Sequence, residues 1–75
     1  MLKFSTYQTT SGLNHYAENE DFELVFIIQK DESTPFVEKK WELREYWYGA
    51  LEEYKYFSKL SEAKAWANMC NSFLV

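Results

Sequence analysis

His15 and Cys70 are the side chains of this 75-residue chain best suited to chemistry near neutral pH, and each type occurs once. Histidine exchanges protons and a cysteine thiolate attacks substrates, but nucleophilic catalysis needs the two together with an orienting partner. The two residues lie far apart in the sequence, and no pattern around either indicates such a site. We expect His15 on the surface of a loop and Cys70 as a small core residue of a helix.

Metal and phosphate chemistry also lack the residues they need. A structural zinc site takes about four Cys or His ligands, more than this chain contains. The acidic group Glu18, Glu20, Asp21 and Glu23 lacks the glycine-centred loop of a tight calcium site. Two glycines make no phosphate-binding loop, and a short chain has little room for the cleft of a carboxylate-pair glycosidase. We therefore predict a non-enzymatic protein with no cofactor and no metal.

Aromatic side chains are the most distinctive feature of the composition, at 20% of the residues. They supply contact area, which a chain of this size needs because it buries a small share of its surface. Residues 1–75 are expected to form one domain. A single cysteine is typical of a reducing compartment, and neither a signal peptide nor a run of about 20 apolar residues is present. We therefore expect a cytoplasmic protein without a membrane partner.

The net charge of −4 indicates what kind of partner to expect. It disfavours nonspecific attachment to nucleic acid and to anionic membranes. A larger protein or protein complex, or another basic surface, fits this charge better.

Short runs of β-forming residues predict the strands of the first half of the chain. Residues 2–9 are typical of an edge strand, and residues 21–29 have apolar side chains on both faces, as in a central strand. We interpret the polar, acidic residues 13–20 as a loop. Residues 31–35 have the Asp, Ser, Thr and Pro composition of a turn.

The aromatic-rich segment 36–57 is compatible with two structures. As a hairpin that turns at Gly49 and Ala50, its first strand alternates apolar with charged residues. As a helix, several apolar residues fall on one stripe and Pro35 fits the first turn. We favour the hairpin because its aromatic residues are β-formers and because Gly49 inside a helix costs roughly 1 kcal/mol relative to Ala.

The register of this hairpin decides where its tyrosines point, since a shift of one residue moves every side chain to the other face. A two-residue loop at Gly49 and Ala50 turns the tyrosines of the second strand into the core. A three-residue loop that includes Leu51 turns them outward. We favour the second register because it pairs Leu43 with Phe57 and Glu45 with Lys55, an apolar pair and an opposite-charge pair.

In the favoured register the hairpin exposes a surface with the composition of a protein-binding hot spot. The alternative, in which the tyrosines only shield a thin sheet and keep their hydroxyl groups in water, stays open. The predicted partner-binding residues are Arg44, Tyr46, Tyr48, Tyr54 and Tyr56, bordered by Glu52 and Glu53.

From Ser58, the expected N-cap, the apolar period becomes helical. The expected buried stripe consists of Leu60, Ala63, Ala67, Cys70 and Leu74, flanked by Trp66 and Phe73. An uncharged tail follows it and leaves a homodimer open. The sequence therefore predicts an α+β fold, in which a small antiparallel sheet of three to four strands carries one C-terminal amphipathic helix on one face.

The second half of the chain resembles many small proteins encoded by phages and other mobile elements, in which a hairpin leads into a short amphipathic helix. The residues that carry this likeness are Trp41, Leu43, Tyr46, Gly49, Tyr54, Tyr56, Phe57, Leu60, Glu62, Ala63, Trp66 and Ala67. In size, acidity and lack of catalytic residues, the chain is similar to phage counter-defence proteins of the anti-CRISPR type. The resemblance implies an inhibitor that occupies a functional surface, such as a nucleic-acid-binding one, of a larger host complex in the host cytoplasm.

Two alternative functions belong to other classes. The aromatic residues suit stacking of single-stranded nucleic acid, with phosphates reached by Lys39, Lys40, Arg44, Lys55 and Lys59. The net charge argues against such direct binding. A small homodimeric regulatory protein is the other alternative.

Overall fold

The computed structural model describes residues 2–10, 12–19, 23–31 and 38–73. Its elements are β1 (Ser5–Thr9), β2 (Gly12–Glu18), β3 (Leu24–Lys30), β4 (Trp41–Trp47), β5 (Ala50–Phe57) and α1 (Leu60–Ser72). The strands form one antiparallel sheet in the order β1-β2-β3-β4-β5. The α+β class is confirmed, but the expected three to four strands were too few.

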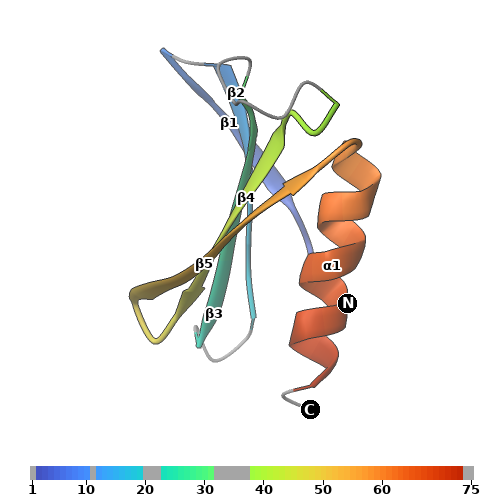
Figure 1. Ribbon diagram of the computed structural model, residues 1–75. Helices are drawn as coiled ribbons and strands as arrows, with labels where there is room; N and C mark the ends of the chain where they lie inside the picture. Colours follow the sequence, from blue (N-terminus) through green and yellow to red (C-terminus); the bar gives the residue numbers. More distant parts are fainter. Residues whose placement is uncertain (1, 11, 20–22, 32–37, 74–75) are drawn as a thin grey trace.

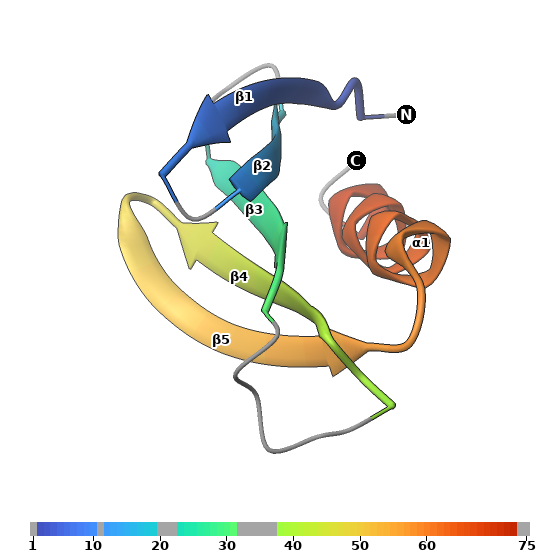
Figure 2. The same cartoon turned by 90° about the horizontal axis from the view of Figure 1, so that it is seen from above.

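The helix packs against one face of the twisted sheet (Figure 1), and Figure 2 shows that no other described helix lies against the opposite face. Alternation along β3 turns Leu24, Phe26 and Ile28 toward α1, where they are fully buried. Each such side chain contributes roughly 1.5–3 kcal/mol through burial. Ala63 and Ala67 of the helix are also fully buried, and their small side chains allow a close approach. The position of β3 at the centre of the sheet confirms the prediction for this strand.

The prediction of a loop at residues 13–20 was wrong, because β2 occupies most of that segment and pairs with both β1 and β3. The alternation of buried and exposed residues along β2 is hard to recognise in the sequence. The buried side chains on the helix side are His15 and Ala17 rather than large apolar ones. The edge strand predicted for residues 2–9 is confirmed for Ser5–Thr9. Leu2 instead joins the core, and its N–H donates to Asn68 Oδ1 of α1 over 2.8 Å.

The hairpin interpretation of the aromatic segment is confirmed by β4 and β5, and the helical alternative is wrong. Its loop, however, consists of Tyr48 and Gly49, with φ angles of 51° and 83°. Two positive φ values in a two-residue loop are the pattern of a type I′ turn, whose twist matches that of the flanking strands. The loop thus begins one residue before the predicted position. The sequence did not indicate this position, because it requires a positive φ at Tyr48, which bulky residues rarely adopt.

Both predicted registers of this hairpin were therefore wrong in their pairings. Leu43 lies opposite Lys55, Arg44 opposite Tyr54, and Glu45 opposite Glu53, with a bulge after Glu45. Each side chain nevertheless lies on the face that the favoured register predicts. The observed partners in this part of β5 differ from the predicted ones by two residues, and a shift of two residues leaves every side chain on the same face.

The helix begins at Leu60 with Lys59 as its N-cap and without a capping side-chain hydrogen bond, so Ser58 is not the cap. The expected buried stripe is confirmed at Ala63, Ala67 and Cys70, whereas Phe73, expected beside it, is the C-cap of α1 and lies exposed. No described helix combines the length and apolar character needed to cross a membrane. Several predicted features lie outside the described residues. They are the first two residues of the strand predicted at 21–29, Glu20 and Asp21 of the acidic group, the turn at 31–35 apart from Asp31, the start of the hairpin at Phe36, and Leu74 with the end of the uncharged tail.

Candidate functional site

Tyrosines from four strands gather on the face of the sheet that α1 leaves uncovered. Directly opposite residues of an antiparallel sheet share a face, so the register places Tyr16, Ile27, Arg44 and Tyr54 in one row. The neighbouring rows hold Tyr7 with Tyr56 and Val25 with Tyr46. We call this surface the tyrosine face and define it as Tyr7, Tyr16, Val25, Ile27, Arg44, Tyr46, Tyr54 and Tyr56.

Arg44 is held in place at the centre of the tyrosine face. Its Nε donates to Oε1 of the buried Glu42 over 2.6 Å, and its guanidinium carbon lies 5.7 Å from the ring centroid of Tyr54. The hydrogen bond to Glu42 is the main reason that the pKa of Arg44 is raised. The Tyr56 hydroxyl donates to the other oxygen of Glu42 over 3.4 Å. These contacts fix the arginine and both rings before any partner binds.

Tyr48 adjoins the tyrosine face at the tip of the β4–β5 hairpin. It is 73% exposed, and its positive φ is a strained conformation for an aromatic residue. Two contacts tie it to Glu23: its N–H donates to the Glu23 carbonyl over 2.8 Å, and its hydroxyl donates to Glu23 Oε2 over 3.3 Å. The charge of Glu23 is the main cause of the raised pKa of Tyr48. The large side chain of Tyr48 is thus exposed to solvent at a turn position whose backbone conformation favours glycine or asparagine.

The residues predicted for the site divide between the two faces. Arg44, Tyr46, Tyr54 and Tyr56 lie together on the tyrosine face, and Tyr48 lies at the adjoining turn. Glu53 departs from the prediction, since it lies opposite Glu45 on the helix side and its Oε1 is 3.1 Å from Lys55 Nζ. Glu52 is exposed in the segment of β5 where the register shifts.

Sequence reasoning missed half of this surface. Tyr7 and Tyr16 extend it across β1 and β2, and Val25 and Ile27 fill its centre from β3. Tyr16 was missed because its segment was interpreted as a loop. The usable signal was the alternation of Asn14, Tyr16 and Glu18 with His15 and Ala17. The Tyr16 hydroxyl donates to Glu18 Oε2 over 2.6 Å, which raises the pKa of Tyr16.

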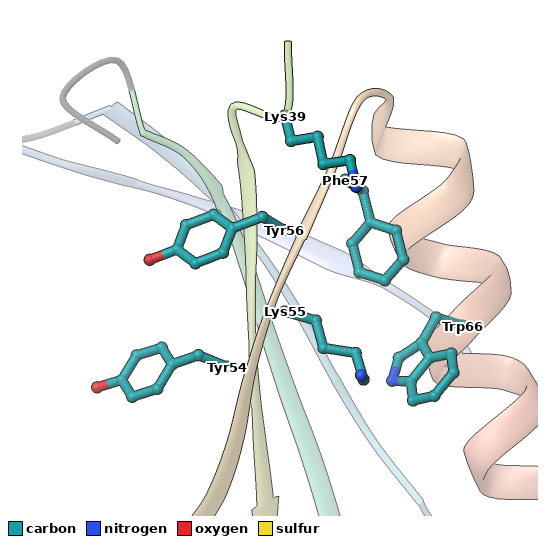
Figure 3. A pocket seen from close by; sticks show the side chains of 6 residues that line it. All are labelled: Lys39, Tyr54, Lys55, Tyr56, Phe57 and Trp66. Carbon is teal, nitrogen blue, oxygen red and sulfur yellow. The ribbon is translucent and has the colours of Figure 1, made fainter. Parts of the chain in front are cut away.

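An open hollow of about 400 Å³ adjoins the edge strand β5. Figure 3 shows that Tyr54 and Tyr56 point to one side of this strand, whereas Lys55 and Phe57 point to the other side, where Trp66 of α1 lies. Lys55 Nζ lies 4.6 Å from the ring centroid of Trp66 and is also paired with Glu53. Much of its charge is therefore already compensated. The residues that line the hollow are Lys39, Tyr54, Lys55, Tyr56, Phe57 and Trp66.

The two residues best suited to chemistry both lie on the helix side of the sheet. His15 is buried, so the prediction of a surface position was wrong; its ring packs edge-on against Trp41 at 6.0 Å, and burial, followed by the charge of Lys64, lowers its pKa. Cys70 is buried as expected, and burial raises its pKa to about 11, so its thiol stays protonated at neutral pH. Among the described residues, no group of three or more His, Cys, Asp or Glu side chains is arranged to hold a metal ion.

Glu45 is a carboxylate buried beneath the helix. Its Oε2 accepts the indole N–H of Trp47 over 2.6 Å, and its Oε1 accepts that of Trp66 over 3.3 Å. The Cys70 thiol lies 3.5 Å from the same Oε1. One charged group thereby satisfies donors from β4 and from α1, which ties the sheet to the helix.

No protein-family model, no curated protein and no solved structure matches this chain. The likeness to anti-CRISPR proteins therefore stays a prediction.

Proposed function

We propose that this protein is a non-enzymatic binding module that docks on a larger protein or protein complex through its tyrosine face and Tyr48. The observation that carries this proposal is the separation of aromatic types between the faces. Five tyrosines lie on the face without a helix, whereas Trp41 and Trp47 face α1 and Trp66 belongs to it. Packing alone does not require this separation.

The composition and rigidity of the tyrosine face suit protein recognition. Tyrosine offers a large contact area with little side-chain entropy to lose, and Tyr and Arg are enriched among residues that dominate binding energy. Tyr54 is 52% exposed and Tyr7 is 42% exposed, so both have area left to bury. The fixed position of Arg44 lowers the entropic cost of binding further.

The charge of the chain suggests the chemistry of the partner. A net charge of −4, with Glu52 exposed on β5, complements a basic surface. Basic surfaces of host complexes are commonly those that bind nucleic acid, and a protein seated there blocks access. The protein would then act as an inhibitor in the host cytoplasm, as its resemblance to anti-CRISPR proteins implies.

The test is capture of the partner from host-cell lysate on the immobilised protein. We expect the wild-type chain to retain one protein or complex with a nucleic-acid-binding surface, and Tyr54→Ala to lose it. Phe73→Ala is the matched control, because Phe73 is an exposed aromatic residue at the end of α1, 78% accessible. Equal capture by all three proteins would contradict the proposal.

Single-stranded nucleic-acid binding remains a second candidate because of the hollow beside β5. It combines Lys39 and Lys55 with aromatic rings, as binding channels for single strands do. The pairing of Lys55 with Glu53 and the acidic net charge argue against it. A labelled oligonucleotide at low salt decides the matter: micromolar affinity that is lost in Lys39→Ala would favour this function, and no binding would remove it.

A further inference from the structure

The strand β5 forms one edge of the sheet. It is eight residues long, and no strand of the described part of the chain lies beyond it. An edge strand of this length turns every second backbone N–H and C=O away from the sheet, where another strand can accept them. The other edge, β1, is shorter and carries no charged residue.

We propose that β5 pairs antiparallel with β5 of a second copy of this chain, about a twofold axis that passes through Tyr54. Such pairing joins the two sheets into one continuous sheet. The axis position follows from the order of the charges Glu53 and Lys55 on either side of Tyr54.

Parity of the side chains limits the registers available to such a pair. Directly opposite residues must lie on the same face, and Tyr54 lies on the tyrosine face whereas Glu53 and Lys55 lie on the helix side. An axis between two residues would place opposite faces against each other, so the axis has to pass through a residue. The regularly paired part of β5 after the bulge runs from Glu53 to Phe57, so the axis can pass only through one of these residues.

Charge then selects among the remaining registers. An axis at Glu53 sets Glu53 opposite its own copy, and an axis at Lys55 sets two lysines opposite each other; both arrangements are destabilising. An axis at Tyr56 carries the pairing past Phe57, where the strand ends. With the axis at Tyr54, each Glu53 lies opposite Lys55 of the other copy, and two opposite-charge pairs form.

β5 also has two features that commonly protect edge strands from aggregation, and here these features favour one pairing register over the others. A bulge and charged side chains discourage indiscriminate pairing. Glu53 and Lys55 are each partly exposed, with side-chain accessibilities of 46% and 33%, so both can reach a second copy. Because opposite charges meet in one register only, the same residues that oppose aggregation favour a single closed dimer.

The dimer would bring the two tyrosine faces into one surface. Tyr54 would lie opposite Tyr54 of the second copy, with Arg44 beside each. The bulge near Glu52 ends the regular pairing, so the interface is small and association weak. This proposal concerns self-association and does not depend on the proposed partner.

The test uses charge reversal and sedimentation equilibrium from about 10 μM to 1 mM protein, the range in which a small interface associates. Glu53→Lys and Lys55→Glu each place like charges opposite each other twice, and we expect each to weaken the dimer roughly tenfold or more. An equimolar mixture of the two variants restores opposite charges in a heterodimer and should recover wild-type association. Lys3→Glu, at an exposed lysine near β1, is the control and should dimerise normally.

A covalent readout in the wild-type chain makes the test independent of how the variants fold. Photo-oxidative cross-linking should join Tyr54 to Tyr54 of the second copy, although Tyr48 is more exposed at 73% against 52%. A wild-type chain that stays monomeric, variants that associate like wild type, a mixture that fails to recover, polymers beyond the dimer, or cross-links mainly through Tyr48 would each overturn the proposal.

Discussion

Glu45 shows how a charged residue becomes part of the core of this small protein. It is 6% exposed and accepts hydrogen bonds from the indoles of Trp47 and Trp66. Hydrogen bonds to charged groups stabilise by about 1.5–3 kcal/mol, and removal of the acceptor leaves two partly buried indole donors unpaired.

We predict that Glu45→Ala lowers the free energy of unfolding by about 2–3 kcal/mol. Urea denaturation followed by tryptophan fluorescence measures this loss. Glu52→Ala is the control, because Glu52 is exposed and its removal should cost less than about 0.5 kcal/mol. Equal effects of the two substitutions would show that the carboxylate of Glu45 does not link sheet and helix.

His15 gives stability a dependence on pH. Burial lowers its pKa below the usual 6.5, so the unfolded chain binds a proton more readily than the folded one. The contribution of neutral His15 to stability is therefore complete above pH 6.5 and is lost as the pH falls through 6.5 toward the lower folded value.

We expect the melting temperature to fall between pH 7.5 and pH 5.5, a window above the ordinary pKa of carboxylates near 4. His15→Gln cannot gain a proton and should flatten this part of the profile, since the chain contains no other histidine. Differential scanning calorimetry at fixed ionic strength measures the difference. An unchanged slope in His15→Gln would contradict the assignment.

A substitution in the turn of the β4–β5 hairpin can affect stability and partner binding in different ways. Its turn requires positive φ at Tyr48 and Gly49, and asparagine suits the first of these positions far better than tyrosine. Tyr48→Asn should therefore leave stability unchanged or raise it by up to about 1 kcal/mol, even though the contact with Glu23 Oε2 is lost.

The same substitution should weaken partner binding by removing an exposed aromatic ring. Thermal denaturation and affinity measured on one preparation of Tyr48→Asn check both effects. A loss of more than about 1 kcal/mol in stability would show that Tyr48 is retained for the fold and not for recognition.

Elements with strong alternation could be predicted from the sequence, and weaker ones could not. The runs around β3 and β4 and the helical stripe of α1 carry large apolar residues, or alanines at helical spacing, so their faces were foreseen. β2 was missed because His15 and Ala17 occupy its core positions. The hairpin register depended on a tyrosine at positive φ and on a bulge, and local propensity predicts neither.

At the scale of the whole molecule, the two faces of one sheet differ in what they contribute. The helix side holds the buried apolar residues, the tryptophans and Glu45, whereas the opposite side holds the tyrosines and Arg44. This division of Trp from Tyr was foreseen for the hairpin, because alternation there is regular. Its extension over β1 and β2 emerged only from the complete strand order.

The tyrosine face is proposed to serve recognition more than stability. The measurement that tests it most directly compares the affinity for the captured partner with the melting temperature in Tyr54→Ala. We expect at least a tenfold loss of affinity, as for a binding hot spot, and a melting temperature within about 2 °C of wild type. An unchanged affinity with a much lower melting temperature would contradict it and would make Tyr54 a structural residue.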